Sequence, residues 1–191
     1  MIDKDTILAA CVGLESEMTA FLDRLVRFES KSSYEGPAME WLYERFGEVA
    51  DECEKIIIPE EIVNDPDYSF RMDDRPYAGR PNVRAVMKGD GTGKSVLMNA
   101  HVDVVPPSQG QKRPFDPYVE DGTMYGRGTC DDKGQVAVVW TIFKAMKQLG
   151  IRPKGDIIVH LVVEEETGGN GTLAMIRKGE KADCCLNLEP A

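Results

Sequence analysis

The sequence predicts an α/β fold in which a mixed, mostly parallel sheet carries helices on both faces. Three observations lead to this prediction. Strand-like and helix-like segments alternate after residue 82, and the strand-like segments are near-continuous apolar runs, which is typical of strands buried on both faces. In addition, 42% of the 191 residues are hydrophobic, enough to build the core of one compact domain. We therefore expect residues 1–191 to form a single unit.

The first part of the chain is predicted to be mainly helical. Apolar residues recur at intervals of three and four over residues 6–29, which indicates an amphipathic helix. A second helix is expected over residues 36–49, with Pro37 in its first turn. Residues 56–58 form a short apolar strand. The acidic residues 60–80 show no periodicity and are expected to form a surface excursion.

The second part of the chain alternates between strands and helices. We predict strands over 82–87, 96–105, 157–163 and 184–188, helices over 135–149 and 172–178, a turn over 88–94 and an irregular loop over 106–129. Cys184 and Cys185 lie in the last apolar run and are expected to be small core residues. The five cysteines form no CxxC pair, so neither a disulfide framework nor a cysteine zinc site is expected.

Charge and hydropathy exclude several classes of function. The chain has 23 Lys and Arg against 33 Asp and Glu, a formal charge of −10 that disfavours nucleic-acid binding. No run approaches the ~20 apolar residues that a membrane helix needs. The first residues are acidic where a signal peptide needs a basic start. We therefore expect a cytoplasmic protein with no membrane partner.

Acidic residues and one histidine directly follow the apolar strands. His101 and Asp103 lie at the end of the 96–105 strand, the glutamates 164–166 follow the next strand, and Glu189 follows the last one. Two further acids, at 131 and 132, precede the 135–149 helix. Sites in α/β sheets form outside the carboxyl ends of strands. Three strands that each deliver charged groups to that edge therefore indicate a site.

This cluster has the chemistry of a cation site. Several carboxylates cannot remain ionised together without cations to offset their repulsion, and one imidazole with several carboxylates suits zinc or a similar divalent ion. His101 and Asp103 are two residues apart on a strand, so Asp103 can accept a hydrogen bond from the ring nitrogen that does not bind metal. Adjacent glutamates diverge at a strand end, so one can bind metal while its neighbour acts as a base.

Four motifs, in this order, resemble the M20 metallopeptidase family, which includes acetylornithine deacetylase, succinyl-diaminopimelate desuccinylase, aminoacylases and glutamate-releasing carboxypeptidases. The motifs are His101-Val-Asp103-Val-Val-Pro106, Tyr125-Gly-Arg-Gly-Thr-Cys-Asp131-Asp132-Lys-Gly134, Glu164-Glu165-Glu166-Thr-Gly168-Gly-Asn-Gly171 and Asn187-Leu-Glu189-Pro190. Each motif alone is a weak signal. The set spans most of the chain after residue 82 and is highly specific.

The resemblance implies a hydrolase with two zinc ions at the complete site, for which Co²⁺ or Mn²⁺ could substitute. It implies that His101 and Glu189 bind one zinc, that Asp131 bridges both metals, and that Glu166 is a further metal ligand. The implied reaction is hydrolysis of an amide bond in an N-acyl amino acid or a dipeptide-like substrate. Overall resemblance makes the deacetylase and desuccinylase branch the first expectation.

The resemblance also implies roles for the neighbouring residues. Glu165 would be the general base, with Glu164 in a supporting position, and Asp103 would orient His101. The peptide bond between Asp131 and Asp132 would be cis.

The sequence departs from the family pattern at its end. The resemblance implies that family members continue into a dimerisation (lid) domain and then back into the catalytic domain, which supplies a second zinc-binding histidine. The other histidine here, His160, alternates with Ile158 and Val162 in an apolar strand and is expected to be a neutral core or sheet-surface residue. We therefore expect residues 1–191 to be the N-terminal part of a catalytic domain, inactive alone, whose parent is a homodimer.

Alternative interpretations belong to other classes of protein. Residues 89–95 resemble a phosphate-binding loop, but Lys88 replaces the required glycine and a strand follows instead of a helix. A glycine-rich hairpin is favoured there.

A non-catalytic metal-binding or interaction module is a second alternative. Asp131 and Asp132 could cap the following helix, and Cys130 is expected to be a bystander, with a reactive thiol as the lesser alternative.

Overall fold

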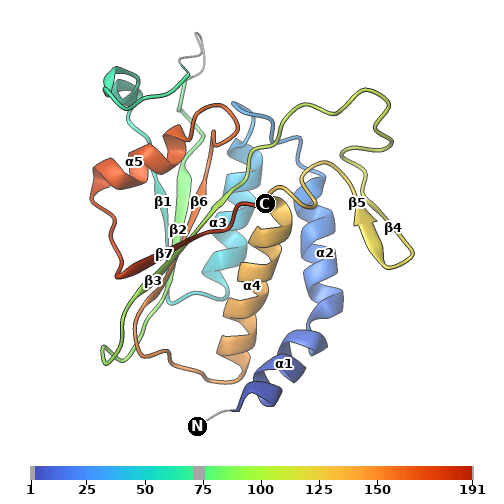
Figure 1. The fold of residues 1–191 in the computed structure, drawn as a ribbon, viewed down its shortest axis with the longest axis vertical. Helices are drawn as coiled ribbons and strands as arrows, with labels where there is room; N and C mark the ends of the chain where they lie inside the picture. Colours follow the sequence, from blue (N-terminus) through green and yellow to red (C-terminus); the bar gives the residue numbers. More distant parts are fainter. Residues whose placement is uncertain (1–2, 71–75, 191) are drawn as a thin grey trace.

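The computed structural model describes residues 3–70 and 76–190, and it confirms a mixed sheet covered by helices (Figure 1). Five strands form the main sheet in the order β1-β2-β6-β3-β7. Their bounds are Glu52–Ile56 (β1), Asn82–Met87 (β2), Val96–His101 (β3), Ile157–Val162 (β6) and Cys184–Asn187 (β7). Strands β6, β3 and β7 are parallel, whereas β1 and β2 are antiparallel to their neighbours. The carboxyl ends of β3, β6 and β7 therefore meet at one edge of the sheet.

Helices cover both faces of this sheet. The helices α3 (Gly36–Gly47) and α4 (Lys133–Gln148) pack on one face, with α2 (Glu15–Val26) outside α4. Helix α5 (Asn170–Lys178) lies on the other face, where Met175 packs against Ile56 and Val162. Alternate residues of β6 point to opposite faces, so Val159 and Leu161 enter the larger core with Phe143 of α4.

The predicted N-terminal helix is divided into α1 (Lys4–Gly13) and α2. Leu14, between them, leaves helical geometry with φ −97° and ψ 3°, and its side chain is buried. The first strand is also displaced from its predicted position. It ends at Ile56 instead of starting there, and Ile57 beyond it is largely exposed. A 3-10 turn, η1 (Glu60–Asn64), lies within the predicted surface excursion, of which residues 71–75 fall outside the described residues.

The predicted irregular loop 106–129 contains a small hairpin of β4 (Tyr118–Glu120) and β5 (Thr123–Tyr125). Asp121 and Gly122 form its two-residue turn and both have positive φ, 49° and 75°, which is the requirement of a type I′ turn. The hairpin lies apart from the main sheet, beside α2 (Figure 1).

The prediction that Cys184 and Cys185 are core residues is wrong. All four residues of β7 are exposed, because β7 is the last strand of the sheet and pairs only with β3. The glycine-rich hairpin predicted over 89–95 is also wrong. Strands β2 and β3 are separated by β6, so this segment crosses the amino end of β6, where Gly89 leaves no room for a side chain against Gly155.

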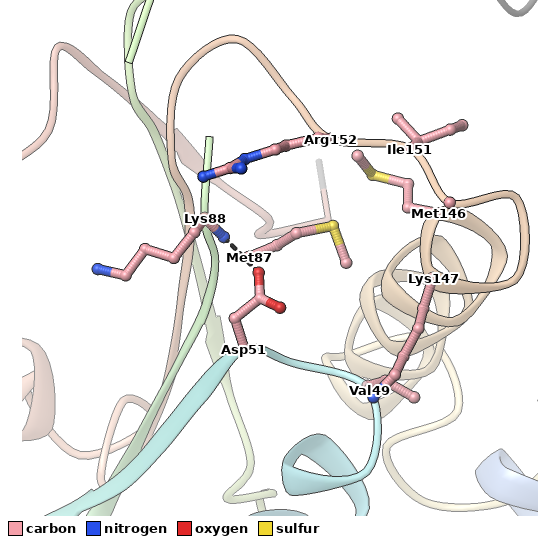
Figure 2. Close-up of a pocket in the computed structure, with 9 residues that line it drawn as sticks. Val49, Asp51, Met87, Lys88, Met146, Lys147, Ile151 and Arg152 are labelled. Atoms are coloured by element: carbon pink, nitrogen blue, oxygen red, sulfur yellow. Dashed lines mark hydrogen bonds between the residues drawn. The ribbon is translucent and has the colours of Figure 1, made fainter. Parts of the chain in front are cut away.

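A hollow of about 390 Å³ lies at this amino edge of the sheet (Figure 2). The main-chain N–H of Lys88 donates to Asp51 there at 2.7 Å, and Arg152 also lines the hollow. Met87, at the carboxyl end of the antiparallel strand β2, pairs with the first residue of β6, so the hollow and the acidic strand ends lie at opposite edges. Among the described residues, no helix is long and apolar enough to span a membrane.

Candidate metal centre

His101 ends β3 and is the centre of the acidic cluster that the sequence predicted. Its ring is 1% exposed. Its Nε2 lies 2.8 Å from Oδ1 of Asp131 and 3.8 Å from Oε2 of Glu189. Two sets of three side chains bring their ligand atoms within 4.8 Å of one another, His101 with Glu165 and Glu189, and His101 with Asp131 and Glu166. The structure thus brings together the five side chains for which metal or base roles were predicted.

Asp103 holds the glutamate loop as well as contacting His101. Strand β3 ends at His101, short of its predicted end, so Asp103 lies just beyond it. His101 Nδ1 is 2.9 Å from the main-chain oxygen of Asp103 and 3.5 Å from its carboxylate. The buried carboxylate instead accepts the main-chain N–H groups of Glu165 at 2.9 Å and Glu166 at 3.1 Å, together with the hydroxyl of Ser32 at 3.0 Å. Asp103 therefore fixes the backbone that carries both glutamates.

The Asp131–Asp132 peptide bond is cis, as the family resemblance implied. Asp132 occupies the N-cap position of α4 but makes no capping side-chain hydrogen bond. Its carboxylate accepts the main-chain N–H of His101 at 3.1 Å, and burial raises its pKa to about 7. Asp131 extends from the same turn toward the ring of His101. This turn thus places one carboxylate against the main chain of β3 and another against the imidazole of His101.

The electrostatics of the cluster are those of a site short of positive charge. Burial lowers the pKa of His101, but hydrogen bonds and charge interactions with Asp103 and Asp131 outweigh it and raise the pKa to about 10. Burial and neighbouring carboxylates raise the pKa of both Glu165 and Glu166, partly opposed by His101. These pKa shifts indicate that the cluster lacks positive charge to offset its carboxylates. A donor set of one imidazole and several carboxylates fits a divalent cation such as zinc, which would supply that charge.

Two groups near the cluster were not predicted from the sequence. Lys133 is fully buried at the start of α4, where its Nζ donates to the main-chain oxygen of Phe28 at 2.8 Å. Burial lowers the pKa of Lys133 to about 7. Arg80 is buried against Glu164. The only sequence signal for Lys133 was its place in the Asp-Asp-Lys-Gly motif, and no local pattern marks Arg80.

An α/β sheet that brings one histidine and several carboxylates together at the carboxyl ends of its parallel strands has the arrangement of a metallohydrolase-like domain. The model of the peptidase family M20/M25/M40 matches residues 97–191, which include this whole centre. The chain belongs to this family.

Three proteins illustrate the similarity. N-formyl-4-amino-5-aminomethyl-2-methylpyrimidine deformylase of Bacillus subtilis (strain 168) is 36% identical over 115 residues, 58% of this chain and 27% of that protein. Succinyl-diaminopimelate desuccinylase of Wigglesworthia glossinidia brevipalpis is 35% identical over 146 residues, 72% of this chain and 37% of that protein. The crystal structure of human carnosine dipeptidase 1 superimposes with a TM-score of 0.79 at 17% identity, covering 97% of this chain and 41% of that one, which supports the fold alone. The chain spans less than half the length of each.

Proposed function

We propose that this centre belongs to a two-zinc hydrolase that cleaves an amide bond in an N-acyl amino acid or a dipeptide-like substrate. The observation that carries the proposal is the convergence of His101, Asp131, Glu165, Glu166 and Glu189 at one edge of the sheet. Membership of a peptidase family supports the reaction class. The names of two relatives, a deformylase and a desuccinylase, support an acyl group on the substrate amide.

The metal ligands in this proposal are His101, Asp131, Glu166 and Glu189. The short contact between His101 Nε2 and Asp131 supports a shared place for both side chains at one cation. Asp131 also groups with Glu166, which supports its role as the bridging carboxylate. Zinc suits a set that includes imidazole, and Co²⁺ or Mn²⁺ would bind the same donors. When bound, two divalent cations supply a polarised carbonyl and an acidified water.

Glu165 is the proposed general base. Its carboxylate lies within 4.8 Å of the ligand atoms of His101 and Glu189, close enough to take a proton from an attacking water. Partial burial raises its pKa, which favours return of that proton to the leaving amine. The hydrogen bond from its main-chain N–H to Asp103 keeps the residue in place during both transfers. No covalent intermediate with the chain is required.

A cavity of about 370 Å³ beside Glu166 offers room for one side of the substrate. Val104, Val105 and Pro106 contribute apolar lining, and Lys31 and Tyr34 also line the cavity. The apolar part of this lining suits a short aliphatic acyl group or amino-acid side chain.

Calorimetric titration of the metal-stripped chain with Zn²⁺ tests the proposal. We expect binding that Glu189→Gln and Asp131→Asn each weaken at least about 10-fold, because each removes a charged ligand. Glu54→Gln is the matched control, since the Glu54 side chain is 47% exposed and that of Glu189 is 40% exposed, but Glu54 pairs with Arg84 and not with the cluster among the described residues. Absence of Zn²⁺ binding at micromolar concentration, or an equal effect of the control, would contradict the assignment.

A further inference from the structure

Arg80 is a buried cation that the proposed chemistry does not use. It lies just before β2, at the same edge of the sheet as His101, and is 4% exposed. Its Nη1 donates to both carboxylate oxygens of Glu35, at 3.0 and 3.3 Å, and its Nη2 donates to Glu164 at 3.4 Å. Both acids are almost completely buried. One guanidinium thus connects the start of α3 to the loop that follows β6.

Glu164 occupies a backbone position that a non-glycine residue seldom adopts. Its φ is +62°, in the left-handed region, and it directly precedes Glu165 and Glu166. Its carboxylate also accepts from Tyr68 at 3.4 Å and from Asn170 at 3.3 Å. A buried carboxylate without a cation is costly. Arg80 therefore stabilises the ionised side chain at a residue whose backbone turns the glutamate loop.

The two ends of the same loop are held by Asn82. Its Oδ1 accepts the N–H of Val163 at 3.1 Å, and its Nδ2 donates to the main-chain oxygen of Gly171 at 2.8 Å. The ends approach so closely that a Cβ on Gly171 would lie 2.2 Å from the oxygen of Val163. With both ends fixed, the direction of the loop depends on its first turn, at Glu164.

We propose that Arg80 is a positioning residue for Glu165 and Glu166, and that it acts through Glu164. The inference rests on the proposed function for the roles of those two glutamates, but the geometry it describes exists without metal. The guanidinium fixes the turn at Glu164, and the turn presents the next two N–H groups to Asp103. Arg80 itself contacts neither a proposed metal ligand nor the cavity beside Glu166.

Hydrogen exchange of the metal-free chain, resolved by residue, tests this inference. We expect Arg80→Gln to speed exchange of the Glu165 and Glu166 amides at least about 10-fold, because their hydrogen bonds to Asp103 open. The amides of Val159 and Leu161, within β6, should change less than about 2-fold. Arg84→Gln is the matched control, because Arg84 lies on β2 but pairs with Glu180 and Glu54, away from the loop. Unchanged exchange at 165 and 166, or an equal increase throughout the sheet, would overturn the inference.

A second variant separates positioning from folding. Glu35→Gln, Arg80→Met and Glu164→Gln together remove every charge of this buried group, so the chain can fold without an unpaired ion. We expect faster exchange at 165 and 166 to persist, and Co²⁺ binding to weaken at least about 10-fold. Wild-type exchange and wild-type Co²⁺ affinity in this variant would mean that the ion pairs only stabilise the fold. If the unaltered chain itself binds no Co²⁺, the proposed function fails, whereas the exchange result still decides the role of Arg80.

Discussion

The two histidines of the chain lie on neighbouring strands and are both buried, yet their surroundings differ. His101 ends β3, among Asp103, Asp131 and Glu189. His160 lies within β6, paired with Asn99, and its Nε2 has no hydrogen-bond partner among the described residues, with Glu180 at 3.5 Å. The acids raise the pKa of His101 to about 10, whereas burial lowers that of His160 to about 4.

This contrast shows what distinguishes a candidate ligand from a core histidine. Burial is the same for both rings, so burial alone identifies neither. The position along the strand decides, because loops that bring acids together start where parallel strands end. Asp103 lies two residues past the end of β3, whereas His160 has strand residues of β6 on both sides.

The largest expected effect is the difference between the two histidines in metal binding. His101→Ala should weaken Zn²⁺ binding at least about 100-fold, since each ligand of a zinc site contributes roughly 3 kcal/mol. His160→Ala removes a ring of equal size and burial and should change the affinity less than about 3-fold. Calorimetric titration of both variants measures this. Similar losses in the two variants would show that burial, and not the acidic surroundings, explains the effect of His101.

Much of this contrast could be predicted from the sequence, because it depends on local patterns. Alternating apolar runs predicted the sheet, and the order of strand followed by acid predicted which residues meet at its edge. The type I′ hairpin was missed although Asp121-Gly122 between β-prone residues is a strong local signal.

Other features depend on partners distant in the sequence. The exposure of Cys184 and Cys185 follows from the position of β7 at the edge of the sheet, which strand propensity does not specify. The crossing of residues 89–95 over β6 follows from strand order in the same way. The contact of Arg80 with Glu35 and Glu164 joins three segments, and no sequence spacing relates them.

The second expected effect is that of His160 on the pH dependence of the unfolding free energy. The pKa of His160 is about 4 in the folded chain and about 6.5 when unfolded, so between these values only the unfolded chain binds the proton. The unfolding free energy should therefore decrease as pH falls, by about 1.5 kcal/mol between pH 6.5 and 5. His160→Leu should remove this part of the dependence. Glu180, Arg84 and Lys178 are the charged groups that face His160, and they are unchanged in the variant.

Urea unfolding of the metal-free chain at a series of pH values measures the difference between wild type and His160→Leu. Comparison of the two proteins cancels the titration of the acidic cluster, which is common to both. A parallel pH dependence in the two proteins would show that His160 accepts a proton in the folded state near its ordinary pKa. The contrast with His101 would then lose its electrostatic basis.

The third prediction concerns whether Asp103 orients the metal ligands through its carboxylate. Asp103→Asn keeps the main-chain oxygen that contacts His101 Nδ1 but removes one of two carboxylate oxygens that accept from the glutamate loop. We expect Zn²⁺ affinity to decrease about 10-fold, a typical effect of groups that orient metal ligands. Asp183→Asn is a close control, because Asp183 accepts the N–H and hydroxyl of Ser95 at the amino edge of the sheet. Unaltered affinity in Asp103→Asn would assign the orientation of His101 to the main chain alone.

The smallest expected effect is that of the Cys130 thiol. Cys130 is exposed and directly precedes Asp131. Its thiolate could therefore be an additional ligand of a metal bound by His101. Among the described residues, the grouped donors are His101 and carboxylates, so Cys130→Ser should change Zn²⁺ affinity less than about 2-fold. Cys184→Ser, which alters another exposed thiol at the amino end of β7, should behave in the same way. A loss of 10-fold or more in Cys130→Ser alone would add a soft ligand to the centre. The difference between His101 and His160 would then depend on sulfur as well as on carboxylates.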